Sequence, residues 1–190
     1  SLIAPDAAVS QKDVLIYKTW NEEYQKIYKN ESAERFDDQV PSSARLNLSR
    51  LWVLTSQNTA SASEVIISGL QPHMNVYTIG DATTGKNTGG SVFSPDDDTE
   101  DKGAYLITMS YENKNRASVA GGIPPYRGYS TNAVYQDASD LGNPSEPLLK
   151  IALEEISGTR STRTLEADDT TLQYTQPATP PRLIATPRQH

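Results

Sequence analysis

The stretch that decides the fold is LWVLTSQNTASASEVIISGLQPHMNVYTIGDATTGK, residues 51–86. Leu48–Thr55 has the composition of a buried strand, and Asn75–Ile79 is again strand-like. Between them, Asn58–Gln71 carries apolar side chains at helical spacing. A strand, a helix and a second strand in this order predict two parallel strands joined by the helix.

The rest of the chain continues this pattern and predicts an α/β layer structure. We expect one domain over residues 1–158. The composition after residue 158 is dominated by Thr, Arg, Asp and Pro, so residues 159–190 are expected to form an extended or disordered arm. The other expected elements are strands at Asp13–Trp20 and Ala104–Ser110, a short helix or extended arm at Asn21–Asn30, a Gly/Thr-rich loop at Asp81–Gly90 and a helix at Pro144–Ile156.

Charge and composition exclude several classes of function. The net charge of −7 argues against nucleic acid as a partner, because phosphate binding needs a basic surface. The chain has no cysteine and only two histidines, which argues against thiol catalysis, a Ser–His–Asp triad and a His-rich zinc site. No apolar run approaches the roughly 20 residues of a membrane span. We expect no cofactor and no metal, and the acidic run Asp96–Asp101 lacks the glycine of an EF-hand loop.

A serine-rich turn, Thr59–Glu64, joins the first strand to the helix. A helix N-terminus offers free N–H groups and a partial positive charge, which can stabilise an oxyanion beside a nucleophilic serine. However, Ser61 and Glu64 also form a capping-box pattern, which any helix could use. On this motif alone, a capping role for Ser61 is favoured over catalysis.

Lys86 lies in the loop that follows the second strand. Without a histidine, a lysine can act as the base for a serine when burial lowers the lysine pKa. If the two strands are parallel, the loops carrying Ser61 and Lys86 leave the sheet at the same end. Taken alone, Lys86 is more simply explained as a solvated loop residue.

Together the two motifs resemble the C-terminal processing (tail-specific) serine peptidases, particularly their Bacteroidetes-type members. That family has a Ser-Ala-Ser-Ala-Ser-Glu-like turn and a Gly-Glu-x-Thr-x-Gly-Lys segment, which stand here as Thr59–Glu64 and Gly80–Lys86. Its lysine follows the nucleophile by 25 positions, as Lys86 follows Ser61, whereas Ser63 would break this spacing. The resemblance covers roughly residues 1–158. It implies a ClpP/crotonase-like α/β spiral core, with Ser61 as nucleophile, Lys86 as base and the Ala62 amide as an oxyanion donor.

The sequence departs from the family in several respects. Gly90 stands where many members have a glutamine that orients the lysine, and Thr83, Thr84 or Thr88 could take its place. The family also has an upstream strand whose loop supplies a second oxyanion N–H, and a PDZ domain that gates substrates; neither has a counterpart here. We therefore expect this chain to be the C-terminal part of a catalytic domain, with an upstream strand and helix missing.

The resemblance implies a serine endopeptidase that cleaves polypeptides near their C-termini in the bacterial cell envelope, either in the periplasm or lipid-anchored. The chain alone is expected to be poorly active. Three alternatives remain: a non-catalytic peptide-binding relative of the same fold, a crotonase-type acyl-CoA enzyme, and a purely structural domain. The lack of a carboxylate pair near the site counts against crotonase hydratase chemistry.

Overall fold

A computed structural model describes residues 2–28, 32–93, 103–126, 140 and 142–159. The acidic run at 96–101, and all but the first residue of the expected arm at 159–190, lie outside these ranges. Within them, no helix is long and apolar enough to cross a membrane.

Among the described residues, two sheets form the framework of the protein. Four strands pair antiparallel in the order β2-β1-β6-β5, and two strands, β3 and β4, pair in parallel. The strands are β1 (Val14–Trp20), β2 (Ala33–Arg35), β3 (Arg50–Thr55), β4 (Asn75–Gly80), β5 (Thr88–Phe93) and β6 (Ala104–Asn113). The helices are α1 (Asp6–Ser10), α2 (Glu22–Tyr28), the 3₁₀ turn η1 (Ser42–Ala44), α3 (Ala62–Leu70) and α4 (Pro147–Ser157).

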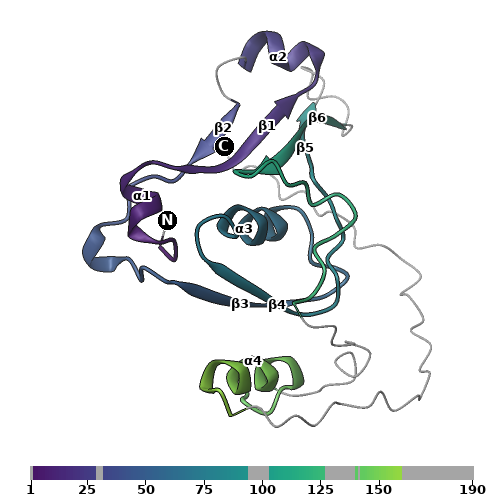
Figure 1. The fold of residues 1–190 in the computed structure, drawn as a ribbon. Coiled ribbons are helices and arrows are strands. Elements are labelled where there is room, and N and C mark those ends of the chain that lie inside the picture. Colours follow the sequence, from purple (N-terminus) through teal and green to yellow (C-terminus); the bar gives the residue numbers. More distant parts are fainter. Residues whose placement is uncertain (1, 29–31, 94–102, 127–139, 141, 160–190) are drawn as a thin grey trace, which may run out of the picture.

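Helix α3 lies between the two sheets, and α4 covers the other face of β3 and β4 (Figure 1). Burial of apolar side chains on both sides of α3 and β4 holds these layers together. On one side a buried cluster contains Ile16, Ile67, Tyr111, Val119 and Ile123. On the other side Ile79 packs against Leu148 and Ala152 of α4.

The parallel pairing of β3 and β4 positions the functional loops. The register runs from Arg50 opposite Asn75 to Thr55 opposite Gly80, so the last residues of both strands are paired. The loops that follow therefore leave the sheet at the same end. This confirms the parallel arrangement that the sequence predicted and places the Ser61 turn beside the Lys86 loop.

The start of α3 differs from the prediction. The helix begins at Ala62 rather than Asn58, because Ser61 has a φ of 56° and a ψ of −115°, which no helical residue can adopt.

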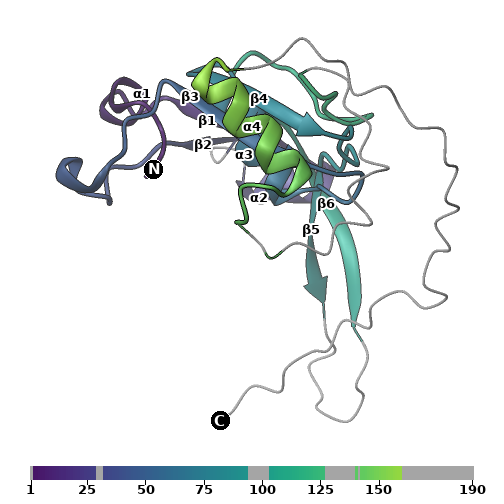
Figure 2. The same cartoon turned by 90° about the horizontal axis from the view of Figure 1, so that it is seen from below.

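The expected loop Asp81–Gly90 is also wrong in part, because β5 already begins at Thr88. Gly89 and Gly90 hid this strand, since glycine is rare in strand interiors. A Cβ on Gly90 would lie 2.2 Å from the Leu106 carbonyl oxygen, so the close approach of β6 requires the glycine. Strands β5 and β6 extend away from the body of the molecule (Figure 2).

Candidate active site

Ser61 occupies a sharp turn between β3 and α3. Its φ of 56° is a conformation that few residues other than glycine adopt, and it costs about 1–2 kcal/mol. The side chain is half-buried, and the turn ends directly at the first residue of the helix. Backbone strain of this kind is often found at functional serines, so it favours a role beyond capping.

Ala62, the first residue of α3, has the properties of an oxyanion donor. Its N–H has no carbonyl within the helix to bond, as for every residue in a first helical turn. Among the described residues this N–H donates to no acceptor, and Ala62 is exposed. A substrate carbonyl oxygen could therefore approach this amide beside Ser61.

A buried carboxylate joins the Ser61 turn to the Lys86 loop. Glu64 has no exposed surface, and its Oε2 accepts hydrogen bonds from Ser61 N and from Lys86 N, both at 2.8 Å. Its Oε1 accepts from the Thr83 hydroxyl at 2.5 Å and from Gly85 N at 2.6 Å. One side chain thus fixes the backbone amides of both proposed catalytic residues.

Burial alone would raise the pKa of Glu64, since it disfavours the charged form. The Thr83 hydroxyl and the amides of Gly85, Ser61 and Lys86 outweigh that effect, so the pKa lies below its usual value of 4.5. Glu64 is therefore ionised at neutral pH, and its charge is stabilised by hydrogen bonds and by the N-terminus of α3.

Further hydrogen bonds connect the two loops. Asp81 N donates to Thr55 O at 3.1 Å, and the Thr55 hydroxyl donates to Asp81 O at 2.8 Å. Thr84 N donates to Thr59 O at 2.9 Å, and the Thr84 hydroxyl donates to Gln57 O at 2.7 Å. The loops therefore form one hydrogen-bonded unit, rather than two segments that happen to be adjacent.

The side chain of Lys86 is exposed, although its backbone is held in place. Its ammonium lies 5.9 Å from the ring centroid of Tyr105 on β6. Among the described residues, no hydrogen bond joins this ammonium to the Ser61 hydroxyl. The structure thus brings the two backbones together and leaves the side-chain contact of the pair as a prediction.

The three threonines proposed to orient Lys86 have different surroundings. The buried Thr83 hydroxyl donates to Glu64 and accepts from Ile123 N at 2.7 Å, so its bonds stabilise the loop. The Thr84 hydroxyl is bound to a carbonyl of the Ser61 loop. Thr88 is half-buried at the start of β5. An orienting role remains a prediction for all three.

Comparisons with known proteins assign the chain to a family. The model of peptidase family S41 matches residues 6–126, which is more than half of the chain. The chain belongs to this family. The resemblance drawn from the sequence is thereby confirmed at family level.

A crystal structure of an S41 protease from Bacteroides fragilis, itself described as putative, matches at a TM-score of 0.69 and 27% identity, over 84% of this chain and 40% of that protease. The chain thus spans less than half the length of this S41 relative. A lipoprotein from Streptococcus agalactiae aligns at a TM-score of 0.49 and 15% identity, over 78% of this chain and 46% of that one. The photosystem II D1 C-terminal processing protease aligns at a TM-score of 0.45 and 19% identity, over 68% of this chain and 31% of that protease. These two likenesses are too loose to support an argument. Among curated proteins no significant match was found.

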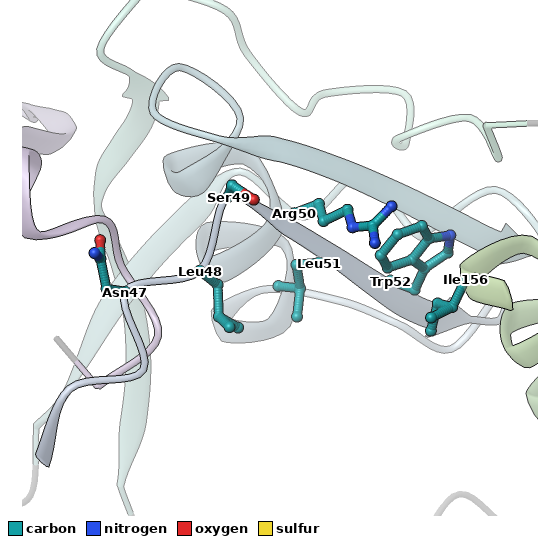
Figure 3. Close-up of a pocket in the computed structure, with 7 residues that line it drawn as sticks. All are labelled: Asn47, Leu48, Ser49, Arg50, Leu51, Trp52 and Ile156. Atoms are coloured by element: carbon teal, nitrogen blue, oxygen red, sulfur yellow. The ribbon is translucent and has the colours of Figure 1, made fainter.

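A shallow hollow in this S41 chain lies away from the Ser61 turn. Its lining comes from the chain entering β3 and from the C-terminal end of α4 (Figure 3). The residues are Asn47, Leu48, Ser49, Arg50, Leu51, Trp52 and Ile156. Because Ser61 follows the opposite end of β3, this hollow is not part of the candidate site.

Gly85 lies close to the backbone of Gly121 and Gly122, which allows a direct test of how the Lys86 loop is positioned. Gly85 has a φ of 86°, and a Cβ there would lie 2.5 Å from Gly122 N and 2.6 Å from Gly121 N. We expect Gly85→Ala to lower the free energy of unfolding by at least about 2 kcal/mol, because strain and overlap add. Urea unfolding followed by circular dichroism measures this.

Gly121→Ala is the matched control, because Gly121 has a φ of 92° but nothing within 4 Å of its Cβ position. This variant should lower the free energy of unfolding by only about 1 kcal/mol, the cost of placing a residue with a Cβ at a positive φ. Equal losses of unfolding free energy in the two variants would show that the close approach of Gly85 to the Gly121 and Gly122 backbone does not constrain position 85.

Two residues of the site carried little signal in the sequence. The sequence predicts Glu64 only as half of a capping box, because its bonds to the Lys86 loop depend on contacts about 20 positions apart in the chain. Tyr111 was one of ten tyrosines and had no motif around it. Its hydroxyl donates to both Ser61 O and Lys86 O, at 3.3 and 3.1 Å.

Proposed function

We propose that this chain is the part of an S41 serine endopeptidase that carries the nucleophile, Ser61, and the base, Lys86. The observation that carries this proposal is the Glu64 carboxylate, which bonds the amides of both residues within a family of peptidases. Polypeptides are the proposed substrates, cleaved near their C-termini. A ClpP/crotonase-like spiral core is the proposed wider architecture.

In the proposed mechanism, neutral Lys86 takes the proton of the Ser61 hydroxyl as its oxygen attacks the scissile carbonyl carbon. The carbonyl oxygen becomes an oxyanion that the Ala62 N–H stabilises. Lys86 then gives the proton to the leaving amine, the C–N bond breaks and an acyl-enzyme remains. Water then attacks the ester carbonyl and loses a proton to Lys86; the bond between that carbon and the Ser61 oxygen breaks, and Lys86 returns the proton to Ser61.

We propose that an upstream segment completes this site. Lys86 is exposed among the described residues, whereas a lysine base needs burial to stay neutral near pH 7. Within the same residues, β3 pairs with β4 on one edge only, so its other edge can accept a strand. A strand there, continuing into a loop, would cover Lys86 and supply a second oxyanion N–H.

The test compares this chain with a longer form of the protein that includes the upstream residues. Both are incubated with an unfolded protein substrate, and new C-termini are identified by mass spectrometry. We expect the longer form to cleave and the 190-residue chain to be slower by about 100-fold or more, as loss of one oxyanion donor predicts. Equal turnover would contradict the need for the segment, and no cleavage by the longer form would contradict peptidase activity.

Two observations favour a second candidate function, a non-catalytic peptide-binding domain. The exposed Lys86 and the glycine at position 90, where many relatives have an orienting glutamine, suit a site that has kept its fold and lost its base. Such a protein would bind unfolded polypeptides and leave them intact in the same incubation. A location in the bacterial cell envelope is proposed on family grounds for either function.

A further inference from the structure

Tyr111 of β6 lies beneath the candidate site, with its ring in the hydrophobic core. It is 3% exposed and packs in the buried cluster with Ile16 and Ile67. Its backbone N–H donates to Asn87 O at 2.9 Å. The ring is therefore held in one orientation, with its hydroxyl directed at the Ser61 turn and the Lys86 loop.

The phenol shares its hydrogen between the Ser61 and Lys86 carbonyls, at 3.3 and 3.1 Å. Ser61 O also accepts from Val65 N at 2.9 Å, within the first turn of α3. The Ser61–Ala62 peptide is trans, so its N–H points opposite to its carbonyl. Fixing Ser61 O on the core side thus aims the Ala62 N–H outward, where a substrate oxygen would lie.

We infer that Tyr111 is a positioning residue of the proposed peptidase, which orients the Ala62 oxyanion amide and anchors the Lys86 backbone. This inference rests on the proposed function. Glu64 holds the amides of Ser61 and Lys86, and Tyr111 holds their carbonyls, so each catalytic residue is fixed at both of its backbone polar groups.

The ionisation of the phenol supports this role. Burial raises the pKa of Tyr111 to about 12, and the negative charge of Glu64 adds to the effect. The hydroxyl therefore remains protonated at neutral pH and is available as a donor. A hydrogen bond to a peptide carbonyl also polarises that peptide, which strengthens its N–H as a donor.

The test is Tyr111→Phe in the longer, active form of the protein. We expect kcat to fall about tenfold to hundredfold, less than for loss of a direct oxyanion donor, because the amide remains but is less well aimed. KM should change by less than about twofold, since ground-state contacts are kept. The affinity for a peptide boronate, whose tetrahedral adduct resembles the oxyanion, should weaken in parallel with kcat/KM, while affinity for the product peptide stays constant.

Tyr24→Phe on α2 is the matched control, because it also removes one phenol hydroxyl, and should leave kcat unchanged. The variant Tyr111→4-aminophenylalanine keeps a donor at the ring end and should restore boronate affinity to within about threefold of the wild type. If that variant binds as weakly as Tyr111→Phe, or if Tyr111→Phe keeps the wild-type kcat, the inference is overturned. If Tyr111→Phe does not fold, the boronate affinity of the 4-aminophenylalanine variant decides the question.

The outcomes separate this inference from the proposed function. If Ser61→Ala is inactive while Tyr111→Phe hydrolyses at the wild-type rate, only the role of Tyr111 is lost. If Ser61→Ala keeps full activity, the proposed function itself is wrong.

Discussion

Replacing Ser61 with alanine should lower the rate of peptide hydrolysis by about 10,000-fold or more, because the proposed acyl-enzyme forms on the Ser61 oxygen. Lys86→Met should cause a loss of similar size, since a base and its nucleophile act as a unit. The measurement is release of a fluorophore from a peptide substrate by the longer form of the protein. Both variants should melt within a few degrees of the wild type.

Two controls make this result specific. Ser63→Ala removes an exposed hydroxyl two residues further along and should leave the rate within about twofold. Lys86→Arg keeps the charge and length but supplies a group that stays protonated, so it should be as inactive as the methionine variant. Full activity in Lys86→Arg would show that Lys86 acts through its charge rather than as a base.

The sequence predicted the part of the site that depends on elements adjacent to one another along the chain. The strand, turn, helix and second strand follow one another closely, and their hydrophobic pattern sufficed to predict parallel pairing and loops at one end of the sheet. The 25-residue interval between Ser61 and Lys86, which matches the resembling family, then indicated that the two residues act as a pair. No local pattern indicates such a pairing. The strained φ of Ser61 was not predicted, because it results from how the turn is held by Glu64 and the helix.

The rest of the site depends on contacts between distant segments. Tyr111 reaches the Ser61 carbonyl across 50 positions, and nothing in its immediate sequence indicates this. Strand β5 was missed for a related reason. Its two glycines have low strand propensity and are explained only by the close approach of β6. In both cases the deciding information lies in tertiary contacts rather than in the local sequence.

Substitution of Glu64 should have the largest effect on stability. In Glu64→Gln the amide nitrogen would replace one oxygen and face two backbone or hydroxyl donors, so two hydrogen bonds are lost and donors oppose each other. We expect the free energy of unfolding to fall by about 3–5 kcal/mol at pH 7, as when a buried charged network is broken. Urea unfolding measures this.

Glu146→Gln provides the matched control. Glu146 is also a carboxylate at a helix N-terminus, and it accepts from Leu148 N and Leu149 N at 3.2 and 2.6 Å. It is half-buried and bonds only its own helix, so its loss should cost about 1 kcal/mol. Equal losses in the two variants would show that the bonds from Glu64 to the Lys86 loop add nothing to capping.

The pH dependence of the same variant tests the charge of Glu64. Because the folded-state pKa is lowered, the carboxylate contributes stability that is present above its usual value of 4.5 and is lost as the pH falls through the folded pKa. The difference in unfolding free energy between wild type and Glu64→Gln should therefore shrink on acidification from pH 7 towards pH 3. Asp13, whose pKa is also lowered, by its hydrogen bond to Lys114, is present in both proteins, so its contribution cancels. A difference that stays constant over this range would mean that Glu64 is not held as a carboxylate. The proposal that an ionised Glu64 links the amides of Ser61 and Lys86 would then be wrong.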